Sequence, residues 1–450
     1  AMTDATQSDT AFRPKPSLPP PANTVGAIGW LRKNLFGGPV DTILTLLGLY
    51  LIYLVVQFII QYGLVNAIWT ADTYRECLDI NKGEGACWAG IGVWFNSMMY
   101  GRYPDEEQWR INFGGIILLL WLIPFWLPKV TGKIQVGMSA VLTFPFLAAS
   151  LFIGGEIGIF LSVMTAIALT LFVSVWLHVA SSYLMGRSLP DLLVSITGFA
   201  NKDDRLHKYV LLGAFGVGVV LSLVYISTWD LEMVPTTIWG GLFLTLVISG
   251  IGISSALPSG ILLALGRRSK MPVIRVFCTA FIELFRSVPL ITILFMAVTM
   301  MPLFLPVELN PPKLAMVIVA VCIFAAAYMA EVVRGGLQAV NKGQYEAAQA
   351  MGLNFWKMMA LIVMPQALKL MIPNIVGSFM GLMKDTTLVS IIGLYDILLM
   401  GKAAGQNPSW LGFHTEPLLF TAAIFFVLCF AMSKYSQHLE RTIGGGYGRR

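Results

Sequence analysis

The chain has 450 residues, of which 56% are hydrophobic and only 12% are charged, and its formal net charge is +6. A soluble domain carries about 25% charged residues, so this composition excludes an ordinary soluble protein and predicts an all-α polytopic membrane protein. The positive excess is typical of cytoplasmic loops in membrane proteins, so we interpret it as a signal of orientation and expect no nucleic-acid partner.

Residues 1–38 differ from the rest of the chain because they are polar and rich in proline, as in FRPKPSLPPPANT. Such a segment cannot bury enough apolar surface to fold, so it is predicted to be a disordered tail. Four basic residues precede the first apolar run and place this tail in the cytoplasm. They are Arg13, Lys15, Arg32 and Lys33.

Five apolar runs follow before residue 230, each of about the length needed to cross a bilayer. Residues 39–230 are therefore predicted to form accessory transmembrane helices. An alternative interpretation of the sequence GGEIG joins the third and fourth runs into one kinked helix, which would change the side of the membrane reached afterwards. The five runs are Val40–Tyr62, Ile111–Leu127, Ile134–Ile153, Ile157–His178 and Tyr209–Thr228.

A long polar loop at residues 66–110 separates the first two runs and is rich in aspartate and glutamate. Since Lys and Arg mark the cytoplasmic side, this acidic loop is expected to lie outside. It contains Cys77 and Cys87, and a disulfide between them is expected because the outside is oxidising. Two free thiols are the alternative. The four histidines are scattered along the chain, so no metal site is predicted.

The second half of the chain contains five further apolar runs, and Lys or Arg flanks every end that we assign to the cytoplasm. This half begins outside and ends inside, which places the C-terminus in the cytoplasm. Since the N-terminal tail is also assigned to the cytoplasm, both termini are expected to be cytoplasmic. The five runs are Ile238–Leu265, Val288–Leu305, Leu314–Val333, Pro365–Met383 and Pro417–Met432.

The sequence KGQYEAAQAMGLNFWKMMALIVMP lies between two of these runs, on the cytoplasmic side. Gly343 is expected to break the preceding helix, after which Glu346, Ala347 and Ala348 start a short helix whose small side chains allow another surface to approach. Gly352 is expected to end that helix, because glycine accepts the left-handed conformation. The segment at 341–360 is therefore predicted to be a docking element for a soluble partner.

The full spacing of this segment resembles the coupling motif of ABC-importer permeases. The sequences FIELFRSVPLI, AYMAEVVRGGLQAV and MKDTTLVSIIGL are similar to permeases for polar amino acids. The loop sequence GEGACWAG is similar to the M-type permease subunit of the general L-amino-acid uptake system. The resemblance is strong over Ile238–Arg441 and loose before it. The motif residues in this chain are Glu346, Ala347, Ala348, Gly352, Ile362 and Pro365.

The resemblance implies a five-helix type I importer permease core in residues 231–450, preceded here by about five extra transmembrane helices. It implies a permease subunit that forms half of the pathway of an ATP-driven, binding-protein-dependent importer of L-amino acids with broad specificity. The implied partners are an ABC ATPase dimer, a second homologous permease in a heterodimer, a periplasmic amino-acid-binding protein and the lipid of the bacterial inner membrane.

No Gly-Lys-Ser or Gly-Lys-Thr of a phosphate loop occurs in the chain. We therefore expect a subunit that is not an enzyme and has no cofactor of its own, with ATP and Mg bound by the partner ATPase. An ion-coupled secondary amino-acid transporter is the alternative, and a channel or scaffold is a third. A secondary transporter usually has internal repeats with broken helices, and no such repeat is recognised in the sequence.

Ionisable residues inside membrane spans are costly and normally functional. Lys384 and Asp385 lie where one helix is predicted to end and the next to begin. A zwitterionic amino acid needs a cation or amide donors for its carboxylate and an acid for its ammonium. We expect Lys384 and Thr386 to bind the carboxylate and Asp385 or Glu331 to bind the ammonium, with Tyr328 on the same face as Glu331. The alternative is that this junction only caps a helix.

Two further charged pairs have helical spacing. Glu283 and Arg286 lie three residues apart on one predicted helix face, as do Glu331 and Arg334. For these residues an ion pair within one helix, which only neutralises charge near the cytoplasmic surface, is the simpler interpretation.

Overall fold

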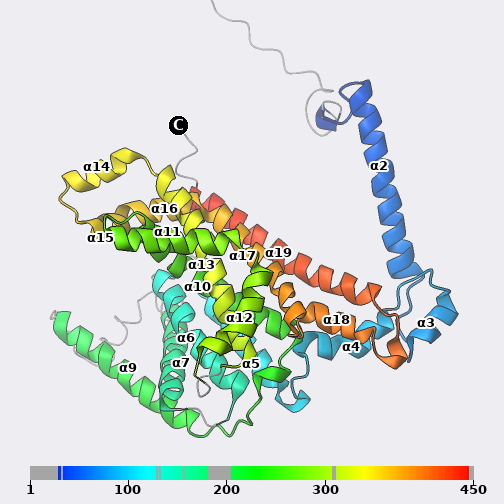
Figure 1. Cartoon of the computed structure of the whole chain (residues 1–450), viewed down its shortest axis with the longest axis horizontal. Helices are drawn as coiled ribbons and strands as arrows, with labels where there is room; N and C mark the ends of the chain where they lie inside the picture. The colour runs from blue at the N-terminus through cyan, green and yellow to red at the C-terminus, as the bar shows by residue number, and fades with distance from the viewer. Residues whose placement is uncertain are drawn as a thin grey trace, which may run out of the picture. The chain divides into compact units, whose positions relative to one another are not determined.

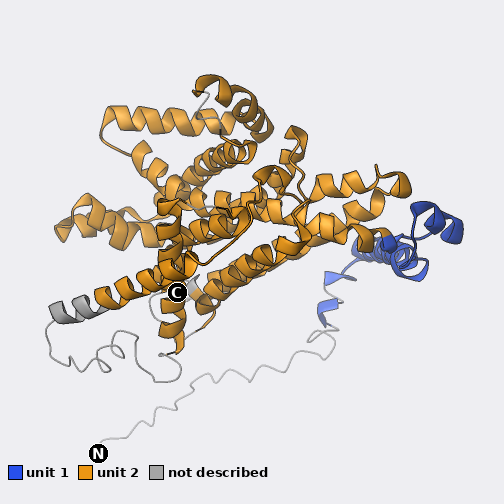
Figure 2. Cartoon of the chain, turned by 90° about the horizontal axis from the view of Figure 1, so that it is seen from below, with its two compact units in different colours: residues 1–89 blue, residues 90–450 orange. Residues whose placement is uncertain are grey.

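The computed structural model describes residues 29–31, 34–127, 130, 133–155, 158–180, 204–306 and 311–444, and this part is almost entirely helical (Figure 1). Its only β features are isolated bridges. The predicted all-α class is thus confirmed over the described residues. Most of the predicted tail at residues 1–38 lies outside them. The chain divides into two compact units, residues 1–89 and 90–450 (Figure 2).

Unit 1 contains α2 (Pro39–Ile60) and α3 (Tyr74–Asn81). No residue of α2 is buried, and its sequence is apolar along almost its whole length. A helix that exposes apolar side chains on every face is suited to lipid and not to water. The helix α3 begins at Thr73, whose hydroxyl accepts a hydrogen bond from the Glu76 N–H. A disulfide joins Cys77 to Cys87, and both residues are buried.

The accessory helices after residue 90 belong to the same compact unit as the predicted core. The helices α6 and α7 are separate and pack against each other, with Gly154 and Gly155 at positive φ between them. The alternative of one kinked helix is therefore wrong. The accessory helices of this unit are α4 (Trp88–Tyr100), α5 (Gln108–Leu122), α6 (Lys133–Ile153), α7 (Ile159–Ala180) and α9 (Asp204–Ile226).

The core is organised around α10 (Gly241–Arg267) and α13 (Lys313–Ala339), which pack along each other. Two glycines of α10 allow this close approach. A Cβ at Gly252 would lie 2.9 Å from the Val321 side chain, and one at Gly260 would lie 2.7 Å from that of Met329. Small residues have this role at helix interfaces in membranes, where packing replaces the hydrophobic effect.

The remaining elements of the core follow in chain order. They are α11 (Pro272–Ser287), α12 (Leu290–Phe304), α14 (Lys342–Ala350), α15 (Phe355–Met358), α16 (Met364–Leu370), α17 (Ile372–Asp385), the 3₁₀ segment η9 (Thr386–Ile392), α18 (Ile397–Ala404) and α19 (Thr415–Gly444).

Eight helices in the described residues are long and apolar enough to cross a membrane, and a ninth is counted if α11 and α12 form one bent span. The eight overlap eight of the ten predicted runs, but the predicted run Pro365–Met383 is divided, and its first part is the separate helix α16. The predicted run at Val288–Leu305 is α12, and the run at Tyr209–Thr228 contains the shorter apolar helix Leu212–Ile226. The chain is therefore a multi-pass membrane protein with a five-helix core after a set of additional helices.

Candidate functional site

A cavity of about 260 Å³ lies among α10, α13 and α17. Its wall is mostly apolar and includes three side chains with polar groups, those of Tyr328, Ser378 and Asp385. Small-molecule sites usually have this character, with a few polar groups that fix the orientation of the ligand. A carboxylate in such a wall needs a cationic partner, because an unpaired charge in an apolar site is costly.

The structure brings only some of the predicted substrate residues to this cavity. Asp385 and Tyr328 line it. The neighbouring Lys384 is exposed and does not line it. Thr386 is buried, and its hydroxyl donates to the carbonyl of Met383 at 2.6 Å. The side chain of Asp385 forms no capping hydrogen bond to η9, so the alternative of a simple helix cap is not supported for this residue.

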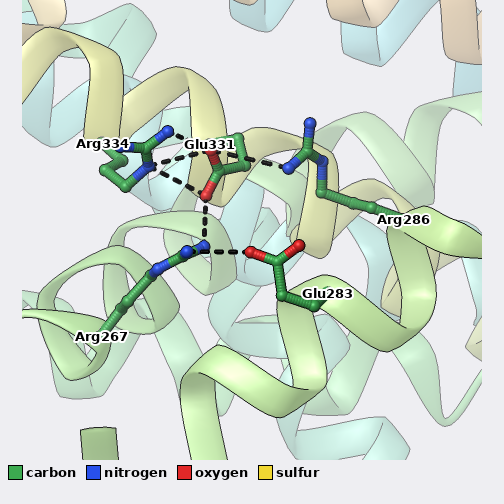
Figure 3. Close-up of polar contacts among 5 residues, drawn as sticks. All are labelled: Arg267, Glu283, Arg286, Glu331 and Arg334. Carbon is green, nitrogen blue, oxygen red and sulfur yellow. Dashed lines mark hydrogen bonds and ion pairs between the residues drawn. The ribbon is translucent and has the colours of Figure 1, made fainter.

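Glu331 lies in a cluster of charges and not in the cavity wall (Figure 3). Arg334 donates to both of its carboxylate oxygens, with Nε at 3.0 Å from Oε1 and Nη2 at 2.6 Å from Oε2. Arg267 Nη1 lies 2.7 Å from Oε1, and Arg286 Nη1 lies 3.6 Å from Oε2. With three guanidinium groups around it, this carboxylate is already paired and is a poor candidate for the substrate ammonium.

The cluster also corrects the expected pairing of Glu283 with Arg286. Glu283 instead accepts from Arg267 Nη2 at 2.8 Å, so its partner comes from α10. Arg286 faces Glu331 of α13, and its guanidinium lies 5.6 Å from the ring centre of Tyr328. These contacts join α10, α11 and α13 at one place, with three positive and two negative side chains.

The short helix predicted at the cytoplasmic side is α14, but it begins earlier than expected. Gly343 does not break a helix, because the side chain of Asn341 caps α14 and accepts from the Gly343 N–H at 2.9 Å. Glu346 and Ala347 are exposed, whereas Ala348 is buried. Gly352 follows the helix with φ of +71°, and the Leu353 N–H donates to the Ala348 carbonyl at 3.2 Å.

Tyr345 attaches this helix to the core, a role that the sequence pattern did not indicate. Its hydroxyl donates to the Leu337 carbonyl of α13 at 2.9 Å. Arg268, just after α10, donates to the same hydroxyl at 3.2 Å and lies 5.6 Å from the ring centre. A third contact joins Gln366 of α16 to Gln344 at 3.0 Å. These contacts fix α14 to the core on one side and leave its other side exposed.

Asp396 is a buried acid that the sequence interpretation missed. It precedes α18, and its side chain accepts from the Leu399 N–H at 3.0 Å. Burial away from water is the main cause that raises the pKa of this carboxyl to about 6, and hydrogen bonds from the helix backbone oppose the shift. The signal in the sequence was an aspartate directly before the apolar run ILLM, which is typical of a helix N-cap.

Arg110, at the start of α5, is also completely buried. It pairs with Glu107 and donates to the Glu232 carbonyl at 2.7 Å. Nearby, the Tyr103 hydroxyl donates to the Phe152 carbonyl at 2.9 Å, and burial raises the pKa of Tyr103 to about 12. The Arg110 contact holds α5 to the segment that leads into α10, and the Tyr103 contact joins the segment before α5 to the end of α6. No group of metal-ligating side chains is found in the described part of the chain.

The chain is similar to known transport proteins. The family described as "Binding-protein-dependent transport system inner membrane component" matches residues 256–445. The chain is 37% identical to the inner membrane amino-acid ABC transporter permease protein YhdY of Escherichia coli K12, over 96% of this chain and 97% of that protein. It is 38% identical to the glutamate/glutamine/aspartate/asparagine transport system permease protein BztC of Rhodobacter capsulatus, over 97% of this chain and 99% of that protein.

Among solved structures, one described as "Crystal structure of an amino acid ABC transporter with histidines" matches with a TM-score of 0.41 and 29% identity. The match covers 45% of this chain and 92% of that one.

Proposed function

The chain belongs to the inner membrane components of binding-protein-dependent transport systems and is an ABC transporter permease, and on that premise we propose that it forms half of the pathway of an ATP-driven importer of L-amino acids with broad specificity. The observation that carries this proposal is the similarity over nearly the whole chain to two permeases whose names specify amino acids. The same similarity favours an importer over an ion-coupled secondary transporter.

We propose that the cavity beside Asp385 is the amino-acid site. The Asp385 carboxylate is suited to the α-ammonium, and the apolar wall accommodates side chains of different kinds. Lys384, the expected cation for the α-carboxylate, is exposed and does not line the cavity. Arg286 supplies positive charge beside Tyr328, a ring that also lines the cavity. A site that recognises only the α-ammonium and α-carboxylate fits many L-amino acids.

We propose that α14 is the coupling helix and contacts a dimer of ABC ATPase subunits through Glu346, Ala347 and the turn at Gly352. ATP and Mg bind to those partners. Exposure of Glu346 and Ala347 supports this assignment, as does the anchoring of Tyr345 on the opposite side. ATP binding would draw the coupling helices of two permeases together and open the cavity outward, and hydrolysis would reverse this motion.

The second permease is proposed to be homologous and not identical, and a periplasmic amino-acid-binding protein is proposed to deliver the substrate. The location is the inner membrane, with both termini in the cytoplasm. This orientation follows from the basic residues that end the inward segments, such as Arg267 and Arg268 after α10.

The proposal is tested in vesicles that contain this permease, its partner permease and the ATPase, with the binding protein added outside. Uptake of labelled glutamate, glutamine and lysine should require ATP enclosed in the vesicles together with the ATPase. It should disappear when the ATPase is replaced by a variant that binds ATP but cannot hydrolyse it. Uptake that follows an ion gradient without ATP would instead establish a secondary transporter.

A further inference from the structure

The helix α11 differs from its neighbours in both direction and exposure. It is bent by 105° from α12, and only a short break separates the two helices. If α12 crosses the membrane, a helix at this angle lies nearly in the membrane plane. All residues from 270 to 277 are exposed, which covers the start of α11 and the turn before it. In Figure 1, α11 runs across the view beside the labels of α10 and α13, and it packs against both of these helices.

The side chains of α11 are divided among three faces. Cys278 and Ile282 are buried against the rest of the protein. Val273, Phe277 and Leu284 occur at helical spacing on a different face and are 78%, 65% and 58% exposed. These three residues form what we call the outer stripe, and Ala280 lies between them on the same face.

The third face carries the charges. Arg275 is exposed on it, and it also contains Glu283 and Arg286, which are held in the charge cluster. Arg268 and Lys270, in the turn before α11, are exposed as well. No aspartate or glutamate occurs between residues 266 and 282. Glu283 is exposed but is paired with Arg267, so the unpaired charges of this part are positive.

An exposed apolar stripe on one side of a helix, with basic residues on the other side and in the turn before it, fits a particular partner. That partner is a bilayer surface that contains anionic lipid. A helix of this kind lies in the interface with its apolar side chains among the acyl chains and its basic side chains at the headgroups. The cytoplasmic leaflet is negatively charged and attracts basic residues next to membrane spans. A soluble acidic protein would match the charges but would leave the outer stripe in contact with water.

We propose that α11 is an in-plane anchor on the cytoplasmic leaflet. Val273, Phe277 and Leu284 lie among the acyl chains, and Lys270 and Arg275 bind the phosphate groups of anionic lipids. The anchor holds Arg286 and Glu283 at a fixed depth, where they meet α10 and α13. This inference concerns the placement of one helix and does not depend on which substrate the protein carries.

The test is a nitroxide scan of the full chain, assembled with its partner subunits in nanodiscs containing phosphatidylglycerol. The three free cysteines Cys278, Cys322 and Cys429 are first replaced by alanine, and the external disulfide is left intact. Labels are then placed through Val273→Cys, Phe277→Cys and Leu284→Cys, with Arg275→Cys as the matched control on the basic face. Collisions with oxygen report on lipid, and collisions with a water-soluble nickel chelate report on water.

The expected result is an oxygen-to-nickel collision ratio several-fold higher at the outer stripe than at position 275. Protection from both reagents at Val273 and Phe277 would mean that a protein subunit covers the stripe, and equal nickel access at all four positions would place α11 in water. Either result overturns the proposal. Exchanging phosphatidylglycerol for phosphatidylcholine should make the label at 277 shallower, and an unchanged depth would refute the role of the basic residues.

Discussion

Replacing Gly352 by alanine isolates the contribution of one backbone conformation to coupling. Gly352 has φ of +71°, and no atom lies within 4 Å of the position that a Cβ would occupy. A side chain there meets open space, so the substitution causes no steric clash with another residue. Its whole cost is that of placing an L-residue in the left-handed region, which is about 1–2 kcal/mol.

A cost of that size shifts a two-state equilibrium by roughly 5- to 30-fold. The turn follows an exposed helix and contributes little to the core, so the chain should stay folded while the turn leaves its native conformation. We therefore expect Gly352→Ala to lower both uptake and substrate-stimulated ATP hydrolysis by roughly fivefold or more, where fivefold is the lower limit of the shift given above. Gly352→Asn should retain most of the activity, because asparagine tolerates this conformation better than other residues do.

Gly343→Ala, within α14, is the matched control for the turn that follows this helix. Gly343 does not have a positive φ, and the nearest atom to its added Cβ is the Asn341 side-chain oxygen at 3.4 Å. This variant should couple normally. The assay is uptake in reconstituted vesicles, together with the amount of assembled complex in each sample. Wild-type uptake by Gly352→Ala, or an equal loss in the asparagine variant, would show that backbone conformation is not what this position supplies.

Three further predictions concern acidic side chains. Asp385→Asn should reduce the uptake of acidic, neutral and basic amino acids together by about tenfold or more, since a hydrogen bond to a charged group contributes roughly 1.5–3 kcal/mol; an equal loss in the exposed control Lys384→Met would move the site away from the cavity. Glu331→Gln should lower the free energy of unfolding by roughly 1–3 kcal/mol, less than for a fully buried pair because the arginines reach water, and an unchanged melting temperature in detergent would contradict this. The pKa of Asp396 is raised to about 6 in the folded protein, so its contribution to stability is complete below about pH 4 and is lost as the pH rises to about 6, by roughly 3 kcal/mol in total. Asp396→Asn should remove this dependence of stability on pH. An equal pH dependence of melting in both proteins would refute the assignment.

The membrane helices could be predicted from the sequence because a bilayer demands long apolar runs, and each predicted run overlaps a helix. Their limits were predicted less well, since α19 continues beyond Met432 to Gly444 and the run from Pro365 is divided between α16 and α17. The start of α14 was missed for a local reason. Gly343 suggested a break, but the Asn341 side chain accepts a hydrogen bond from its N–H and so stabilises a first turn that contains the glycine.

The charged residues were harder to assign because their partners come from other helices. Glu283 had Arg286 at suitable spacing on its own helix, yet it pairs with Arg267 of α10. Adjacent residues in a helix point about 100° apart, which explains why Asp385 lines the cavity and Lys384 does not. The sequence shows which residues are costly to place in a membrane, but only the packing of the helices shows which of them meet.

The same two helices connect the proposed coupling surface to the proposed substrate site. Tyr345 binds α14 to the end of α13 and, through Arg268, to the end of α10. Both α10 and α13 also form the cavity wall, and Arg267 and Glu331 join them directly. Packed helices shift as rigid elements and not by continuous deformation. A displacement of α14 would therefore reach the cavity through these two helices, and Tyr345 is the residue through which α14 contacts the ends of both.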